Sequence, residues 1–261
     1  MMDIYVPSYN RPNAPVIRKF IEADIPFTIV LDHKEDVEAY KKHESAKTRI
    51  LLLDRALGIG YVRQCIKDRY RGVPVIMLDD DTELRARKFE DPTKLFSCNT
   101  PKTVRYWVQM IDKFCRENKF DIGSAADSAF KWSDTHKVLR SGSLCSVTIF
   151  NSPRCKEINY DPNLYKRMED HDLILQAIER KFTFLICNEV VRHCPMNKSA
   201  EDKGGCSEVY KNDTVMVQTT NYLLNKYGSD IVILSKSKKI GNCCDFRVDY
   251  KKYRQRHGYD Y

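Results

Sequence analysis

Three consecutive carboxylates close an apolar stretch of the chain: Asp79, Asp80 and Asp81 follow the run Val73-Pro-Val-Ile-Met-Leu78. Such a run is typical of a buried parallel strand, and open α/β sheets bind ligands outside the carboxyl ends of their strands. Neighbouring carboxylates repel one another unless a cation lies between them. Oxygen ligands at positions i and i+2 suit Mg²⁺ or Mn²⁺ bridging a diphosphate. The alternative is a solvated acidic turn after a strand.

The first half of the chain contains the elements that would position these carboxylates. Apolar segments at residues 3–7, 27–31 and 49–54 are typical of strands. Between them, apolar residues recur at helical spacing, as in residues 16–21 and 58–70. Strands that alternate with helices at this interval predict a parallel sheet.

The second half is less regular. We expect an amphipathic helix over residues 103–118, strands over 120–126, 144–150 and 182–186, and helices that begin near 169 and 214. This pattern predicts an α/β protein with a mostly parallel sheet flanked by helices and a mixed second half. With 261 residues, the chain is long enough for one large domain.

The net charge of +8 is concentrated toward the end of the chain. Residues 231–261 contain eight Lys or Arg side chains and three Asp side chains, interleaved with tyrosines. A basic segment with aromatic residues favours a polyanionic partner such as DNA. The alternative is a solvated tail that keeps the protein soluble.

No segment has the apolar length of a membrane span, and the start of the chain lacks the basic and apolar regions of a signal peptide. We therefore expect a cytoplasmic protein without a membrane partner. The ten cysteines form no Cys-x-x-Cys pair, so reduced thiols are expected. A zinc site built from His193, Cys194, Cys206 and the pair Cys243-Cys244 is an alternative whose spacing matches no known pattern.

Taken in order, these motifs resemble the nucleotide-sugar glycosyltransferases of the GT-A fold, especially the family 2-like group. Four stretches resemble features of this family. Val6-Pro-Ser-Tyr-Asn-Arg-Pro12 resembles its opening strand and loop, and Gly60-Tyr-Val-Arg63 resembles the segment before its metal-binding strand. Asp79-Asp-Asp81 matches the Asp-x-Asp signature, and Glu169-Asp170 matches the acidic pair beside the acceptor. Gln64 departs from the family pattern, which has Asn there. The match spans about residues 3 to 195.

The resemblance implies a GT-A type, Rossmann-like catalytic domain over residues 1–230. Its nucleotide-sugar-binding half would be 1–85 and its acceptor half 86–230, followed by the basic aromatic segment 231–261. The implied nucleotide-sugar ligands are Pro7, Ser8, Tyr9, Asn10, Arg11, Asp32, Arg63, Asp79 and Asp80. Local alternatives exist for several of them: Asp32 as a turn cap, Arg63 as a surface side chain, and Arg11 as ordinary loop chemistry.

The resemblance also implies a metal site and a base. Asp79, Asp81 and His193 are the implied ligands of Mn²⁺ or Mg²⁺, although His193 is equally consistent with a polar turn after a strand. A carboxylate near the acceptor hydroxyl would take its proton as it attacks the anomeric carbon. We predict Asp170 as this base, with Glu169 second; the alternative is a helix N-terminal cap.

Within this superfamily the chain is most similar to the small TET-associated or phage DNA-modifying group. The resemblance implies a metal-dependent, inverting enzyme that moves a sugar from a UDP-sugar to a hydroxymethylated pyrimidine in DNA, such as 5-hydroxymethylcytosine. It would act in the cytoplasm, that of the host if the protein is from a bacteriophage, with no obligate protein partner. Three alternatives stay open: a transferase acting on a glycan or protein, a non-catalytic nucleic-acid-binding module, and a nucleotidyltransferase.

Overall fold

The computed structural model describes residues 2–128, 136–139, 144, 146–193, 213–235 and 245–259. In the first half, strands alternate with helices in the order β1 (Asp3–Pro7), α1 (Pro15–Glu22), β2 (Phe27–Leu31), η1 (Lys34–Asp36), α2 (Val37–Lys41), β3 (Thr48–Leu52), α3 (Ile59–Lys67) and β4 (Val75–Leu78). β1 pairs in parallel with β2 and with β4, and β2 pairs in parallel with β3. The alternating parallel half predicted from the sequence is confirmed.

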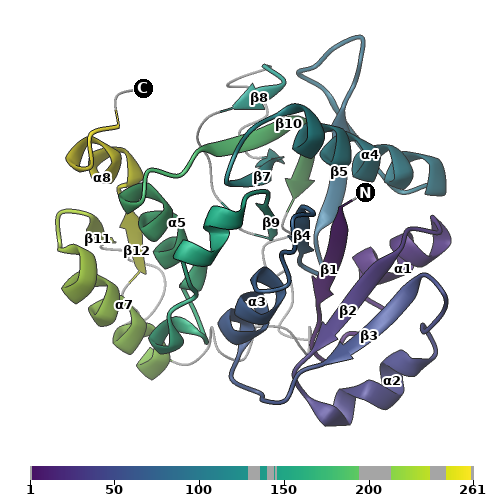
Figure 1. The fold of residues 1–261 in the computed structure, drawn as a ribbon, viewed down its shortest axis with the longest axis horizontal. Helices are drawn as coiled ribbons and strands as arrows, with labels where there is room; N and C mark the ends of the chain where they lie inside the picture. The colour runs from purple at the N-terminus through teal and green to yellow at the C-terminus, as the bar shows by residue number, and fades with distance from the viewer. Residues whose placement is uncertain are drawn as a thin grey trace.

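The second half adds mostly antiparallel strands to the same sheet. Its elements are β5 (Glu83–Arg87), β6 (Leu95–Ser97), α4 (Pro101–Glu117), β7 (Ile122–Asp127), β8 (Val138–Leu139), β9 (Val147–Phe150), the 3₁₀ turns η3 (Pro153–Glu157) and η4 (Pro162–Leu164), α5 (Glu169–Glu179) and β10 (Phe184–His193). The strand order is β3-β2-β1-β4-β9-β7-β10-β5-β6, with β8 on β10. The mixed second half is therefore confirmed as well (Figure 1).

The pairing directions bring several strand ends to one edge of the sheet. β9 runs antiparallel to both β4 and β7, so β4 and β7 run the same way, and β10 runs parallel to β7. The carboxyl ends of β2, β1, β4, β7 and β10 consequently open at the same edge, where β9 begins. This edge is where an open α/β sheet binds its ligands.

Helices cover both faces of the sheet. Strand side chains alternate between the faces: Ile76 and Leu78 of β4 pack with α1 and α4, whereas Val75 and Met77 pack with α3 and α5. Trp107 of α4 is fully buried on the first of these faces. The two apolar layers hold the sheet between them and fix the edge that carries the carboxylates.

The end of the chain folds into what we call the C-terminal unit: α7 (Asp213–Tyr227), β11 (Val232–Ser235), β12 (Asp245–Val248) and α8 (Tyr250–Arg256). β11 and β12 form an antiparallel pair, and the unit lies beside α5 (Figure 1). Ile231 and Val232 are fully buried in the same core as α5. Apolar residues on both sides of position 230 therefore share one core, and the division of the chain at that position stays a prediction.

The aromatic side chains of this segment also serve the core. Tyr253 is 3% exposed, and Phe246 and Tyr250 pack against α5. These rings of the basic segment therefore pack within the protein, and binding of the segment to a polyanion stays a prediction. In the part of the chain that is described, no helix is long and apolar enough to span a membrane.

Candidate active site

The aspartate triplet forms the turn between β4 and β5 at the carboxyl edge of the sheet. The backbone N–H of Asp79 donates to the carbonyl of Ser146, just before β9, at 2.8 Å. The side chains of Asp79 and Asp81 are 26% and 39% exposed, whereas that of Asp80 is 5% exposed. The first and third carboxylates are thus accessible from the edge, and the middle one is enclosed.

Asp80 organises the first loop from inside the protein. Ser8 Oγ donates to Asp80 Oδ2 at 2.5 Å and lies 2.7 Å from the hydroxyl of Tyr40, a fully buried residue of α2. Burial raises the pKa of Asp80 to about 7, although Arg11 and Ser8 oppose the shift. The oxygens of Asp80 face the protein interior, and its predicted contact with the nucleotide-sugar stays a prediction.

The loop after β1 is held in place by α2 and by the triplet. The backbone N–H of Arg11 donates to the Tyr40 hydroxyl at 2.9 Å, and that of Asn10, which has a left-handed φ of 52°, donates to Asp36 at 3.0 Å. Arg11 Nη1 donates to Asp81 Oδ2 at 2.9 Å and lies 3.5 Å from Asp80. The loop therefore presents a guanidinium directly beside the exposed carboxylate.

The carboxyl end of β2 contributes the neighbouring part of the edge. Asp32 Oδ1 lies 2.8 Å from His33 Nδ1, and the His33 ring packs on Tyr9 with 4.5 Å between ring centroids. Pro7 is buried within β1, so the accessible members of the predicted nucleotide set on this side are Tyr9, Asn10 and Arg11. Whether Asp32 accepts a hydrogen bond from a nucleobase or ribose stays a prediction.

Arg63 of α3 joins the triplet to the start of α5. Its Nη2 donates to both oxygens of Asp79 at 2.9 and 3.0 Å, and its Nη1 donates to Glu169 Oε1 at 2.5 Å. Burial alone would lower the pKa of Arg63, but Asp79 and Glu169 raise it above its ordinary value, so the guanidinium stays charged. The sequence predicted that Arg63 binds the diphosphate. In the structure its guanidinium is bonded to the carboxylates of Asp79 and Glu169, and its side chain is 10% exposed.

Two glycines allow this close approach of α3 to α5. A Cβ on Gly60 would lie 2.7 Å from Tyr165 Cα and 3.3 Å from Glu169 Cβ. Gly58 has a φ of 109°, which favours glycine, and a Cβ there would lie 2.8 Å from the carbonyl oxygen of Tyr165. Gly58 and Gly60 at the start of α3 therefore allow this helix to pack closely against Tyr165 and Glu169.

The first turn of α5 is anchored on three of its side chains. Burial raises the pKa of Glu169 to about 7 against the opposing effect of Arg63. His171 Nδ1 lies 2.5 Å from the Tyr250 hydroxyl, and the fully buried Asp172 accepts from Tyr227 at 2.6 Å and from Lys226 at 2.7 Å. The turn is held from α3 on one side and from the C-terminal unit on the other.

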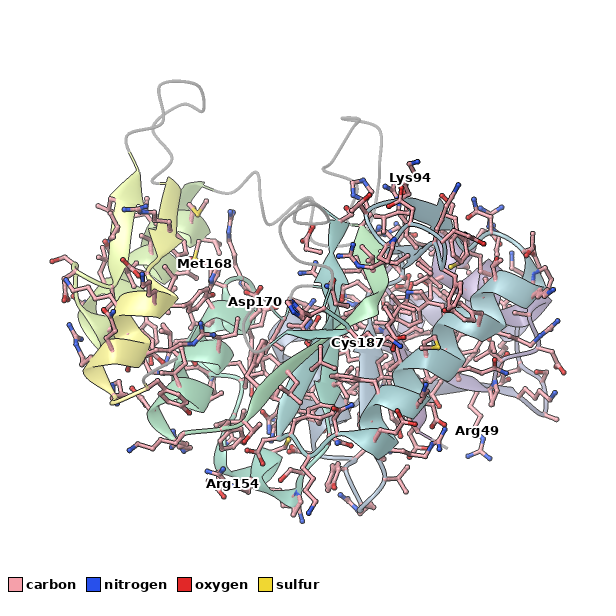
Figure 2. All side chains as sticks on the ribbon, turned by 90° about the horizontal axis from the view of Figure 1, so that it is seen from above. Arg49, Lys94, Arg154, Met168, Asp170 and Cys187 are labelled. Atoms are coloured by element: carbon pink, nitrogen blue, oxygen red, sulfur yellow. The ribbon has the colours of Figure 1, made fainter. Side chains whose placement is uncertain are left out.

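Asp170 is the half-buried carboxylate of this turn. It lies between the C-terminal unit and the central sheet (Figure 2), and its Oδ1 accepts from the N–H of His171 at 2.9 Å. Its neighbour Glu169 is 4% exposed and already bonded to Arg63. Of the predicted acidic pair, Asp170 is therefore the more exposed residue.

His193 ends β10 at the same edge of the sheet. Its Nδ1 lies 2.7 Å from Ser128 Oγ, and its register partner in β5 is Glu83. Among the described residues, no three His, Cys, Asp or Glu side chains lie close enough together to hold a metal ion. Asp79, Asp81 and His193 thus do not form a preassembled three-ligand site, and the role of His193 stays a prediction. The other residues of the zinc alternative, Cys194, Cys206, Cys243 and Cys244, lie outside the described residues.

The chemistry of Asp79 and Asp81 nevertheless fits a divalent cation. Both offer carboxylate oxygens, both are partly exposed, and they stand two residues apart on one turn. Mg²⁺ and Mn²⁺ favour oxygen ligands, and Mg²⁺ is commonly bound by one or two carboxylates together with substrate phosphates and water. The two carboxylates could therefore bind such an ion through part of its coordination shell.

Sequence reasoning missed several residues that hold the site. They are Tyr40, Ser146, Lys226, Tyr227 and Tyr250. Tyr40 carried a usable signal, since it is the one aromatic side chain in the otherwise polar stretch 34–43. The others act through contacts that are distant in sequence, which no local pattern reveals.

Comparison with known proteins supplies the family. A family described as TET-Associated Glycosyltransferase matches residues 2–205. The curated protein Beta-glucosyl-HMC-alpha-glucosyl-transferase of Enterobacteria phage T6 is 32% identical over 87 residues. That match covers 33% of this chain and 30% of the length of the phage protein.

Two solved structures are similar to this chain to different degrees. The mannosyltransferase PcManGT from Pyrobaculum calidifontis, solved with GDP-Man and Mn²⁺, superposes with a TM-score of 0.51 at 10% identity, covering 88% of this chain and 64% of the other. The structure of S. aureus TarS residues 1–349 with UDP gives a TM-score of 0.47 at 15% identity, covering 86% of this chain and 66% of the other.

The predicted fold class is confirmed by the sheet of this chain together with the similarity to the mannosyltransferase structure. The family match covers well over half of the chain and includes the triplet, Arg63 and the acidic pair. The chain therefore belongs to the TET-associated glycosyltransferase family.

Proposed function

We propose that this glycosyltransferase moves a sugar from a UDP-sugar to the hydroxymethyl group of a modified pyrimidine in DNA, such as 5-hydroxymethylcytosine. The family and the phage relative support this acceptor class. The proposed place of action is the cytoplasm, that of the host if the protein is viral. A target base within a duplex would have to be extruded, or presented in a single strand.

The donor side of the proposal rests on the triplet. Asp79 and Asp81 would hold Mn²⁺ or Mg²⁺, with His193 as a further ligand, and the ion would neutralise the charge that develops on the departing diphosphate. Tyr9, Asn10, Arg11 and Asp32 lie along the same edge and would bind the nucleotide. Asp80 and Arg63 would position the residues that bind the donor, since Asp80 bonds to Ser8 of the first loop and Arg63 bonds to Asp79.

The acceptor side rests on Asp170, and one observation carries it. The neighbours Glu169, His171 and Asp172 are each bonded to another part of the protein, which fixes the turn while Asp170 keeps partial exposure. A fixed, accessible carboxylate suits a general base that takes the proton of an attacking hydroxyl. The proposed reaction is a single displacement, in which the anomeric carbon inverts.

The test combines a substrate screen with one variant. Nucleotide-sugars are incubated with hydroxymethylated and plain oligonucleotides and with oligosaccharides, and the added sugar mass is read by mass spectrometry. We expect transfer to the hydroxymethylated DNA only. Transfer restricted to oligosaccharides would show that the acceptor assignment is wrong.

Asp170→Asn is expected to reduce transfer by about 10²- to 10⁴-fold, the usual contribution of a general base. Binding of UDP, measured by calorimetry, should stay unchanged. Asp24→Asn is the matched control, because Asp24 is an exposed aspartate paired with Lys47 near the amino ends of β2 and β3, opposite the edge that carries the site. Full turnover by Asp170→Asn would place the base elsewhere.

A further inference from the structure

Each accessible carboxylate of the triplet is paired with an arginine. Asp79 accepts from Arg63 at 2.9 and 3.0 Å, and Asp81 accepts from Arg11 at 2.9 Å. These are the two carboxylates to which the proposed function assigns the cation. The arginines therefore already supply the positive charge that three adjacent aspartates require.

The two arginines differ in how firmly they are held. Arg63 is bonded to a second carboxylate, Glu169, at 2.5 Å, and its side chain is 10% exposed. Arg11 also lies beside a second carboxylate, Asp80, but at the longer distance of 3.5 Å, and its side chain is 28% exposed on the loop that follows β1. The backbone of Arg11 is anchored separately by Tyr40, so its side chain can change partners while the loop keeps its shape.

A cation on Asp81 and the guanidinium of Arg11 compete for the same carboxylate. Both are positive, so each weakens the binding of the other at close range. A diphosphate offers Arg11 a better partner, because a guanidinium binds phosphate oxygens in a fork of two hydrogen bonds. Transfer of Arg11 to the phosphates would leave Asp81 to the cation.

We infer that Arg11 couples nucleotide binding to cation binding. Without nucleotide it holds Asp81 and keeps cation affinity low; with a nucleoside diphosphate it turns to the phosphates and releases Asp81. By linkage, the cation strengthens nucleotide binding by the same factor. This inference rests on the proposed donor site and adds a named residue that sets the order of assembly.

The experiment measures Mn²⁺ binding directly, by electron paramagnetic resonance of the free ion, with and without UDP. In the unchanged protein, UDP should tighten Mn²⁺ binding by about 5- to 100-fold, the usual range of coupling between two sites. Coupling alone is not diagnostic, since the diphosphate itself binds the ion. The discriminating measurement is therefore the Mn²⁺ affinity of the UDP-free protein.

Arg11→Gln removes the competing charge and keeps a side chain of similar length. It should raise the Mn²⁺ affinity of the UDP-free protein by about 5-fold or more, within the same range of coupling, and should weaken UDP binding without metal. Arg11→Lys keeps the charge, so its Mn²⁺ affinity without UDP should stay within about twofold of that of the unchanged protein, a difference too small to count as coupling. Arg154→Gln is the control, because Arg154 pairs with Asp121 at 3.1 Å at the opposite edge of the sheet and its loss removes the same charge.

Thermal unfolding of each variant confirms that it is folded, and Arg11→Met replaces Arg11→Gln if the latter is not. If Mn²⁺ affinity without UDP is unchanged or lower in the neutral variant, while UDP and Mn²⁺ still bind together, the inference is overturned and the donor site stands. If the unchanged protein binds no Mn²⁺ even with UDP, the cation assignment of the proposed function fails and the inference fails with it.

Discussion

The two sides of the candidate active site are built in different ways. On the donor side, loops follow directly from the ends of the parallel strands β1, β2 and β4, and most of their contacts are with one another or with α2. On the acceptor side, the first turn of α5 is held by residues from α3, α7 and α8, up to 106 positions away in the sequence. Arg63 is the side chain that joins the two sides.

The two sides therefore depend on different parts of the fold. The donor side depends on the direction in which the strands run, so the sheet alone brings its residues to one edge. The acceptor side depends on the docking of the C-terminal unit, which bonds to His171, Asp172 and Glu179 along α5. Changes to the C-terminal unit should therefore disturb transfer while leaving the nucleotide site intact.

The largest effect is expected where the two sides meet. Arg63→Met removes the shared partner of Asp79 and Glu169 and leaves buried carboxylate charge unpaired, which typically costs about 3–5 kcal/mol of stability. The loss should be smaller at pH 5 than at pH 8, because the pKa of Glu169 is already raised to about 7 by burial and the protonated acid needs no counter-charge. Urea unfolding at both pH values measures this. An equal loss at both pH values would show that Glu169 does not depend on Arg63.

A second effect belongs to the donor side alone. Burial raises the pKa of Asp80 to about 7, above the ordinary value of 3.8. Between these values the folded state binds more protons than the unfolded state, so this carboxyl contributes stability at low pH that is lost as pH rises through 7. Between pH 5 and pH 7 the unchanged protein should lose about 2–3 kcal/mol relative to Asp80→Asn.

The measurement is urea unfolding of both proteins across this pH range. Glu169 titrates in both of them, so the difference between the two curves isolates Asp80. Parallel curves would mean that the Asp80 carboxylate is stabilised by Ser8 and Arg11 as well as it is by water. Asp80→Asn should also leave the shape of α5 unchanged, because Asp80 contacts Ser8 and Arg11 of the first loop.

Sequence reasoning worked well for the donor side because its logic is local. The apolar runs that form β1, β2 and β4 are followed at once by Ser8–Arg11, Asp32 and the triplet, and parallel pairing brings them together. It did not show that Asp80 turns inward or that Arg63 pairs with Asp79 and Glu169, since no local pattern reveals these contacts. The alternation of polar and apolar residues in Glu83-Leu-Arg-Ala-Arg87 is typical of a strand and would have predicted β5.

The acceptor side was only half predictable. The acidic pair at a helix start was found, and Glu169 indeed begins α5. The partners of that turn were not, because Tyr227 and Tyr250 lie in segments whose composition indicated a plain helix and a basic tail. Only tertiary packing shows that their hydroxyls meet α5. Charge and aromatic content do not reveal which rings of the basic segment pack in the core, so the packing of Tyr253 and Phe246 could not be predicted.

The smallest effect is expected on the acceptor side, where two tyrosines each donate a hydrogen bond to a carboxylate of α5. Tyr227→Phe removes one donor from the buried Asp172 near Asp170, and Tyr253→Phe removes one from Glu179 at the far end of α5. Each hydrogen bond to a carboxylate is worth about 1–3 kcal/mol, so both variants should be slightly destabilised. Only Tyr227→Phe should slow transfer several-fold, with UDP affinity unchanged, because only Asp172 shares the first turn with Asp170. An equal loss of rate in both variants would mean that the C-terminal unit supports α5 as a whole and does not position its first turn.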